Sequence, residues 1–180
     1  MKLTSMLPAL AGFLILTGCE IPTPSLLSLD PVATGQEATT DNLLVGAWES
    51  SSSGDEVCVI RRDGDKGYQI THFGGDSPRS FEARLFRVAE AQMLELTPAG
   101  DDDFRVVGHT FARIWTGGGA LRWAFLDSDW LKQQASQLPN HTANDKMLLL
   151  APGPVVRAFI AKYGVDEKAY GNQVTWQRVQ

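Results

Sequence analysis

The sequence predicts a mainly β domain with a minor α component, namely an antiparallel up-and-down β-barrel or half-barrel with two short C-terminal helices. Short runs of β-forming residues recur about every ten residues between turns rich in Gly, Asp and Pro, which is typical of barrels and sandwiches. Residues 80–89 alternate apolar and polar positions, as a strand with one buried face does. Residues 155–163 instead repeat their apolar positions at helical spacing.

Turn signals divide the first part of the domain into strands. Asp63-Gly64 is a strong signal, because an Asp-Gly step favours a tight hairpin between two strands. Gly117-Gly118-Gly119 marks a second turn further along. The strands expected from this pattern cover residues 43–49, 56–62, 67–73, 80–89, 93–97, 104–115 and 120–125.

The C-terminal part alternates helices with short strands. Ser128 is the expected N-cap of the first helix and Pro139 ends it. Pro154 fits the first turn of the second helix, and Gly164 is its expected stop. The two helices are expected at 130–138 and 155–163, and the two strands at 147–151 and 173–179.

The first eighteen residues have the pattern of an export signal. Lys2 is the one charge in residues 1–18, and the apolar stretch after it is shorter than the about 20 residues of a membrane span. Leu16-Thr17-Gly18-Cys19 then resembles the lipobox of bacterial lipoproteins. The resemblance implies cleavage before Cys19 and attachment of acyl chains such as palmitate to the new N-terminus. An ordinary signal peptide cut near Gly18 is the alternative.

The same resemblance implies a location and a first partner, the membrane that holds the lipid anchor. Proteobacterial lipoproteins kept in the inner membrane tend to carry Asp after the lipidated Cys, and this chain has Glu20 there. The resemblance therefore implies the periplasmic face of the outer membrane. The inner membrane and the cell surface are the alternatives.

Residues 19–40 are expected to form a flexible lipidated tether ahead of a single domain at 41–180. A small and polar run covers 34–40, and such a segment buries too little apolar surface to order itself. Prolines also interrupt helix and sheet alike. The prolines of this segment are Pro22, Pro24 and Pro31.

A Gly-X-Trp motif opens the expected domain, with Gly46 and Trp48 as its fixed residues. It resembles the opening of lipocalins and lipocalin-like β-barrels, in which the Trp closes one barrel end and an Arg from a late strand lies across the indole. The resemblance implies that Gly46, Trp48 and Arg178 form a structural barrel end, with a cation–π contact between the last two. A core aromatic that opens a sheet is the alternative for Trp48.

The body of the chain is also similar to a set of small bacterial lipoproteins of unassigned function. The similarity rests on Asp129-Trp130-Leu131 after the last meander strand and on the amphipathic helix at 155–163. The two late helices depart from a simple lipocalin. Ligand binding is therefore an analogy at the level of the fold.

Composition narrows the class of protein further. The chain of 180 residues has a formal net charge of −5 and no Lys/Arg cluster, which argues against a nucleic-acid partner. With Cys19 lipidated, Cys58 has no partner, so a disulfide framework is excluded. Cys58 lies in an apolar strand-like run and is expected to be a small buried residue rather than a reactive thiol.

No catalytic, cofactor-binding or metal-binding set is evident in the sequence. His72, His109 and His141 lie far apart, and no His or Cys pair has zinc-ligand spacing. Gly117-Gly118-Gly119 lacks the Lys and Ser/Thr of a phosphate loop. The expectation is a protein that is not an enzyme and holds no cofactor.

Three functions stay open. The first is a structural or interaction lipoprotein that binds another envelope protein through a surface patch. The alternative is a carrier of an apolar small molecule or lipid in a barrel cup, which requires an apolar cavity. The third is a hydrolase with a site assembled from distant residues such as His72 and His109.

Overall fold

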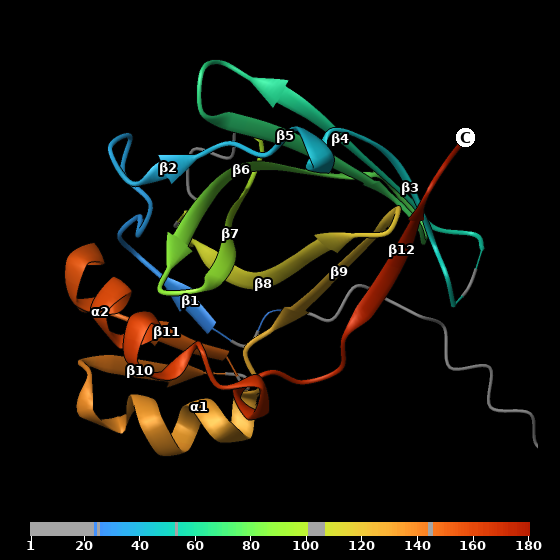
Figure 1. Cartoon of the computed structure of the whole chain (residues 1–180). Helices are drawn as coiled ribbons and strands as arrows, with labels where there is room; N and C mark the ends of the chain where they lie inside the picture. Colours follow the sequence, from blue (N-terminus) through green and yellow to red (C-terminus); the bar gives the residue numbers. More distant parts are fainter. Residues whose placement is uncertain (1–23, 25, 53, 101–106, 144–145) are drawn as a thin grey trace, which may run out of the picture.

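The computed structural model describes residue 24 and residues 26–52, 54–100, 107–143 and 146–180 (Figure 1). Antiparallel strands close into an eight-stranded barrel, because β12 pairs with β9 on one side and with β3 on the other. The predicted barrel is thus confirmed in its closed form. Its strands are β3 (Gly46–Ser50), β4 (Val57–Asp63), β5 (Gly67–Phe73), β6 (Arg79–Val88), β7 (Ala91–Pro98), β8 (Thr110–Gly117), β9 (Ala120–Phe125) and β12 (Val174–Arg178).

Alternation along each strand fills the barrel. In β5, Tyr68, Ile70 and His72 are buried while the residues between them are exposed or half-buried. This period of two places apolar side chains from every strand in one interior cluster. Its largest fully buried members include Trp48 and Trp176.

Strand boundaries follow the expectation closely, with three differences. The expected strand at 43–49 splits into a 3-10 helix, Asn42–Leu44, and β3, because the Asp41 side chain caps the 3-10 helix by accepting a hydrogen bond from the Leu43 backbone N–H. The strand expected at 104–115 begins at Thr110, and 101–106 lies outside the described residues. Three short strands were not expected, namely β1 (Leu26–Ser28), β2 (Ala38–Thr39) and β10 (Asn140–Ala143), the last of which pairs with β11 (Lys146–Leu149).

A second layer packs on the outside of the barrel (Figure 1). It contains α1 (Ser128–Gln134), α2 (Gly153–Tyr163) and a small sheet in which β1 (Leu26–Ser28) and β10 flank β11. A second core joins this layer to the barrel wall. It includes Phe86, Met93, Phe111, Val156, Phe159, Ile160, Met147 and Leu149.

The first of these helices begins one residue away from the expected cap. The Asp127 side chain accepts hydrogen bonds from the backbone N–H groups of Asp129 (3.0 Å) and Trp130 (2.9 Å), and Ser128 is the first residue of the helix. Asp has the same capping ability as Ser, so the local pattern did not distinguish the two.

No helix in the described part of the chain is long and apolar enough to cross a bilayer.

The prediction of a flexible tether over 19–40 is wrong for residues 26–40. Leu26, Val32 and Ala33 are buried, and β2 (Ala38–Thr39) pairs with β6. The segment is ordered by a contact with a barrel residue far along the chain, which its own composition does not indicate. The Glu95 carboxylate accepts hydrogen bonds from the backbone of this segment. Cys19 and the expected signal at 1–18 lie outside the described residues.

Candidate functional site

One end of the barrel is sealed by the residues of the Gly-X-Trp motif. The Arg178 guanidinium carbon lies 4.4 Å from the ring centroid of Trp48. Arg178 also donates from Nη1 to the Val45 carbonyl (2.8 Å) and from Nη2 to the Leu43 carbonyl (2.6 Å). The Trp48 Nε1–H donates to the Leu44 carbonyl at 2.9 Å. The indole N–H of Trp48 and both Nη groups of Arg178 thus have partners, so this end of the barrel is a structural plug.

Gly46 completes this closed end through its lack of a side chain. Its φ of +148° is unfavourable for other residues, and a Cβ at this position would overlap Nη1 of Arg178. The structure thus brings Gly46, Trp48 and Arg178 together, as the resemblance implied. None of the three is among the described residues that line the two cavities considered next.

The opposite end of the barrel opens into a cavity of about 490 Å³, which we call the cup. Its walls come from the ends of β5, β7 and β9 and from the starts of β6 and β8. Small-molecule sites typically have volumes of about 300–1,000 Å³. The apolar and aromatic side chains that line the cup are Leu27, Ile70, Phe81, Leu96, Trp123 and Phe125.

Two buried rings with polar nitrogens, those of His72 and Trp123, line the cup, and the Trp176 ring, which is not part of the lining, contacts both of them. The His72 and Trp176 rings meet edge to face with centroids 5.8 Å apart, and those of Trp176 and Trp123 are 6.0 Å apart. Both indole Nε1–H groups and both ring nitrogens of His72 have no hydrogen-bond partner among the described residues. Such a concentration of unpaired buried donors is unusual, because buried polar groups are normally hydrogen-bonded.

Charged side chains surround His72 at the mouth of the cup. Glu56 Oε2 lies 3.7 Å from His72 Nε2, beyond hydrogen-bond distance. Arg79 is the direct cross-strand neighbour of His72, so both side chains lie on the inner face of the sheet. Burial, with a smaller contribution from Arg79, lowers the pKa of His72, which keeps the imidazole neutral at neutral pH. Lys146 lines the mouth as a second cation.

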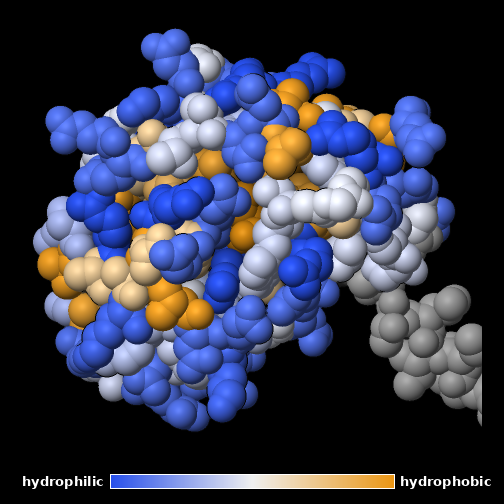
Figure 2. All heavy atoms as spheres, in the orientation of Figure 1, coloured by the Kyte–Doolittle hydropathy of each residue, from blue (hydrophilic) through white to orange (hydrophobic). Residues whose placement is uncertain are grey.

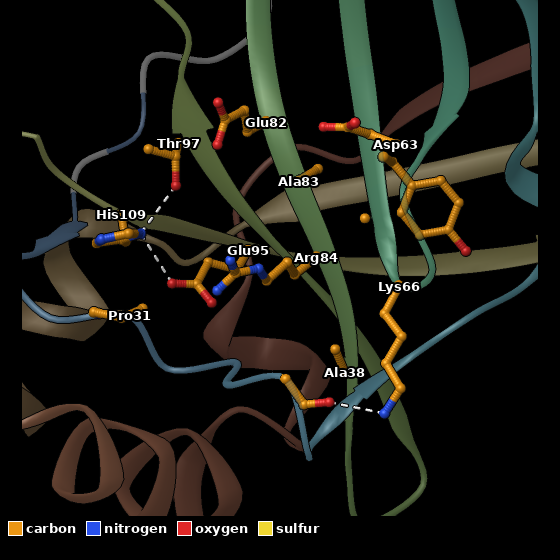
Figure 3. Close-up of a pocket in the computed structure, with 13 residues that line it drawn as sticks. Pro31, Ala38, Asp63, Lys66, Glu82, Ala83, Arg84, Glu95, Thr97 and His109 are labelled. Atoms are coloured by element: carbon orange, nitrogen blue, oxygen red, sulfur yellow. Dashed lines mark hydrogen bonds and ion pairs between the residues drawn. The ribbon is translucent and has the colours of Figure 1, made fainter.

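A second cavity of about 470 Å³ lies outside the barrel, between the wall and the segment around Pro31 (Figure 3). Its two cations are already paired with backbone carbonyls. Arg84 Nη1 donates to the Ala33 carbonyl (3.2 Å), and Lys66 Nζ donates to the Gly35 carbonyl (2.7 Å). We call this cavity the outer groove. Because its donors hold the N-terminal segment, they are not available to a ligand as those of the cup are.

Glu95 and His109 give the outer groove a superficial likeness to a catalytic set. His109 Nδ1 lies 3.0 Å from Glu95 Oε1 and 2.9 Å from Thr97 Oγ1. Both contacts use the same ring nitrogen, so no relay runs from the carboxylate through the imidazole to the hydroxyl. The Glu95 oxygens also accept from Val32 N–H (3.0 Å) and Ala33 N–H (2.7 Å), which makes Glu95 a clasp for the segment.

The histidines named from the sequence are not brought together. His72 lies inside the barrel, His109 lies beside the outer groove, and His141 is exposed on β10. Cys58 is buried opposite His72, and burial raises its pKa to about 12, so it stays a neutral thiol. Within the described ranges, no three His, Cys, Asp or Glu side chains are grouped as metal ligands.

Sequence reasoning did not single out Arg79 as a site residue, and it gave Trp123 only as one of five tryptophans that could line a ligand mouth, face a partner or fill the core. Alternation over residues 120–125 does place Trp123 on the same face as Leu121 and Phe125. The signal that Arg79 faces inward is its register opposite His72, which depends on the exact length of the turn between β5 and β6.

No family model, curated protein or solved structure matches this chain. Its class is therefore defined by the fold alone. The chain forms a closed eight-stranded antiparallel β-barrel, compatible with a lipocalin-like fold, with one plugged end and one open apolar cup.

Proposed function

We propose that the barrel binds an apolar small molecule in the cup. The observation that carries this proposal is the cavity of about 490 Å³ at the open end, walled by inward-facing apolar and aromatic side chains. A preformed apolar cavity with a few polar groups is the usual form of a small-molecule site. The plug supports the same proposal, since Arg178 and Trp48 close the barrel at the end opposite the cup.

The surface gives less support to a role as a structural or interaction protein. That role requires a contiguous exposed apolar patch. On the face shown in Figure 2, apolar side chains form small separate groups among hydrophilic ones. A hydrolase has still less support, because His72 and His109 lie on different sides of the barrel wall.

We further propose that the chain carries lipid on Cys19 and resides at the periplasmic face of the outer membrane. The support is the lipobox-like run that ends at Cys19. Metabolic labelling with an alkyne analogue of palmitate tests this. Label is expected on the full chain and on a Cys58→Ser variant, and its persistence in Cys19→Ser would contradict the attachment site. Fractionation of the labelled cells tests the membrane.

Ligand binding is tested with N-phenyl-1-naphthylamine, a neutral fluorophore whose emission rises in apolar sites. A Thr110→Phe substitution fills the cup, since Thr110 is buried and lines it. The matched control is Thr71→Phe on β5, whose side chain lies outside the cup. Dye binding is expected to be saturable and to be lost in the first variant only. Equal binding by both variants would contradict the proposal, and thermal unfolding verifies that each is folded.

A further inference from the structure

We infer that the ligand of the cup is an amphiphilic carboxylate whose head group binds at the corner formed by Arg79, His72 and Trp123. This inference rests on the proposed function and adds the chemical class of the ligand. It follows from the kind of polar group that the cup presents and from the sign of the charges at its mouth.

The polar groups of the cup include N–H donors that lack acceptors. Trp123 is 3% exposed, its Nε1–H has no partner among the described residues, and an indole N–H can only donate. Neutral His72, 1% exposed, also lines the cup and brings one ring N–H that has no partner among the described residues. A ligand oxygen would satisfy a donor whose burial is otherwise costly, whereas a plain hydrocarbon would not.

Among the described residues, the two charged side chains that line the cup are both cations. Arg79 and Lys146 belong to the lining, and Arg79 faces inward beside His72. Glu56 approaches His72 at 3.7 Å but is not among the described residues that line the cavity. The mouth therefore favours an anionic head group, and an Arg guanidinium matches a carboxylate with two parallel hydrogen bonds.

The outer groove serves as an internal comparison. It also contains cations, Arg84 and Lys66, but both donate to backbone carbonyls of the N-terminal segment. Its acid Glu95 is bound by two backbone N–H groups. The cup differs because the ring nitrogens of His72 and Trp123 have no partner among the described residues and its walls are apolar, as an amphiphile requires.

Three probes with the same alkyl chain test the head group: dodecanoate, dodecanol and dodecyltrimethylammonium. Each probe is titrated against N-phenyl-1-naphthylamine bound to the full folded domain, at concentrations below the critical micelle concentration of that probe, and displacement of the dye is measured. Dodecanoate is expected to bind at least about tenfold more tightly than the cation, with the alcohol between them. Equal affinities, or tighter binding of the cation, would overturn the inference.

Two variants test the proposed corner. Trp123→Phe removes one donor and keeps an aromatic ring, and Arg79→Gln removes the charge. Each is expected to reduce the preference for dodecanoate over dodecanol severalfold. The matched controls are Trp115→Phe and Arg87→Gln, which lie outside the described lining of the cup and are expected to keep that preference. A preference unchanged in both corner variants would overturn the inference.

The two proposals fail in different ways. Saturable dye binding without head-group preference would contradict the carboxylate inference and leave the carrier function standing. Failure of the dye and of dodecanoate to bind a folded domain would contradict both.

Discussion

Trp123 and Trp176 meet edge to face inside the barrel, with ring centroids 6.0 Å apart and an interplanar angle of 81°. Neither indole Nε1–H has a hydrogen-bond partner among the described residues, whereas Trp48 at the plugged end donates to the Leu44 carbonyl at 2.9 Å. The two ends of one barrel thus use the same residue type differently. At one end the Trp48 indole stabilises the plug, and at the other end the unpaired indole N–H belongs to Trp123, which lines the cup.

This contrast predicts unequal costs for the same substitution. Trp48→Phe removes a made hydrogen bond and the contact with Arg178, while Trp176→Phe removes a donor that is already unpaired. Both side chains are almost fully buried, so the loss of packing is similar. The Trp48 variant is expected to lose about 2 kcal/mol more of the free energy of unfolding. Urea denaturation measures this, and equal losses would contradict the assignment of the two ends.

Stability is expected to fall in acid because of His72. Burial and the nearby Arg79 lower its pKa below the ordinary value of 6.5, while Glu56 lies on its other side. As the pH falls below about 6.5, the unfolded chain takes up a proton that the folded chain resists, so the free energy of unfolding decreases.

A matched pair of variants isolates that effect. His72→Gln is expected to flatten the dependence of stability on pH between about pH 5 and 7. His141→Gln, which changes an exposed histidine, is expected to leave that dependence as it is. The same slope in all three proteins would show that His72 does not contribute.

The clasp at Glu95 is expected to be important for the order of the N-terminal segment. In Glu95→Gln, an amide replaces the carboxylate that accepts hydrogen bonds from Val32 N–H and Ala33 N–H. The NH₂ group of the amide is itself a donor, so it would face a backbone N–H group without an acceptor between them. A loss of about 3 kcal/mol is expected. Glu82→Gln, an exposed change at the outer groove, is the control.

Hydrogen exchange locates the effect of that change. The amides of Val32 and Ala33 are expected to exchange faster in the Glu95 variant than in the Glu82 variant. Unchanged protection at both amides would mean that the apolar contacts of the segment are sufficient to hold it.

A small substitution at Gly46 tests the plug. Gly46→Ala is expected to destabilise the barrel by about 2 kcal/mol or more, since the backbone has a positive φ and the new methyl group would displace Arg178 from Trp48. Gly117→Ala is the control, because its φ is not positive and no atom lies near the added carbon. Thermal unfolding compares them, and equal stability would contradict the close approach of Arg178.

Much of the fold could be predicted from the sequence because its signals are local. Alternation and turn residues gave β5 and β9 with their exact bounds, and the amphipathic run at 155–163 gave α2. The Gly-X-Trp motif is also local, and it pointed to the pair of Trp48 and Arg178 through a resemblance.

The remaining features depend on distant contacts. Residues 26–40 are ordered by Glu95, which lies more than sixty positions away, so their own composition gave the wrong answer. The cup likewise depends on register, because one residue of slip would turn Arg79 and His72 to the outer face. The proline content and the net charge of a segment indicate neither its contacts with distant residues nor the pairing register of its strands.

The central claim is tested most directly by following the indole N–H resonances of the five tryptophans during a dodecanoate titration. Single Trp→Phe variants assign the signals in ¹H–¹⁵N spectra. The account predicts that the Trp123 signal moves downfield as its N–H gains an oxygen acceptor, with a smaller change at Trp176, while those of Trp115 and Trp130 on the outside stay in place. A stationary Trp123 signal at saturating dodecanoate, or movement confined to the outer tryptophans, would contradict it.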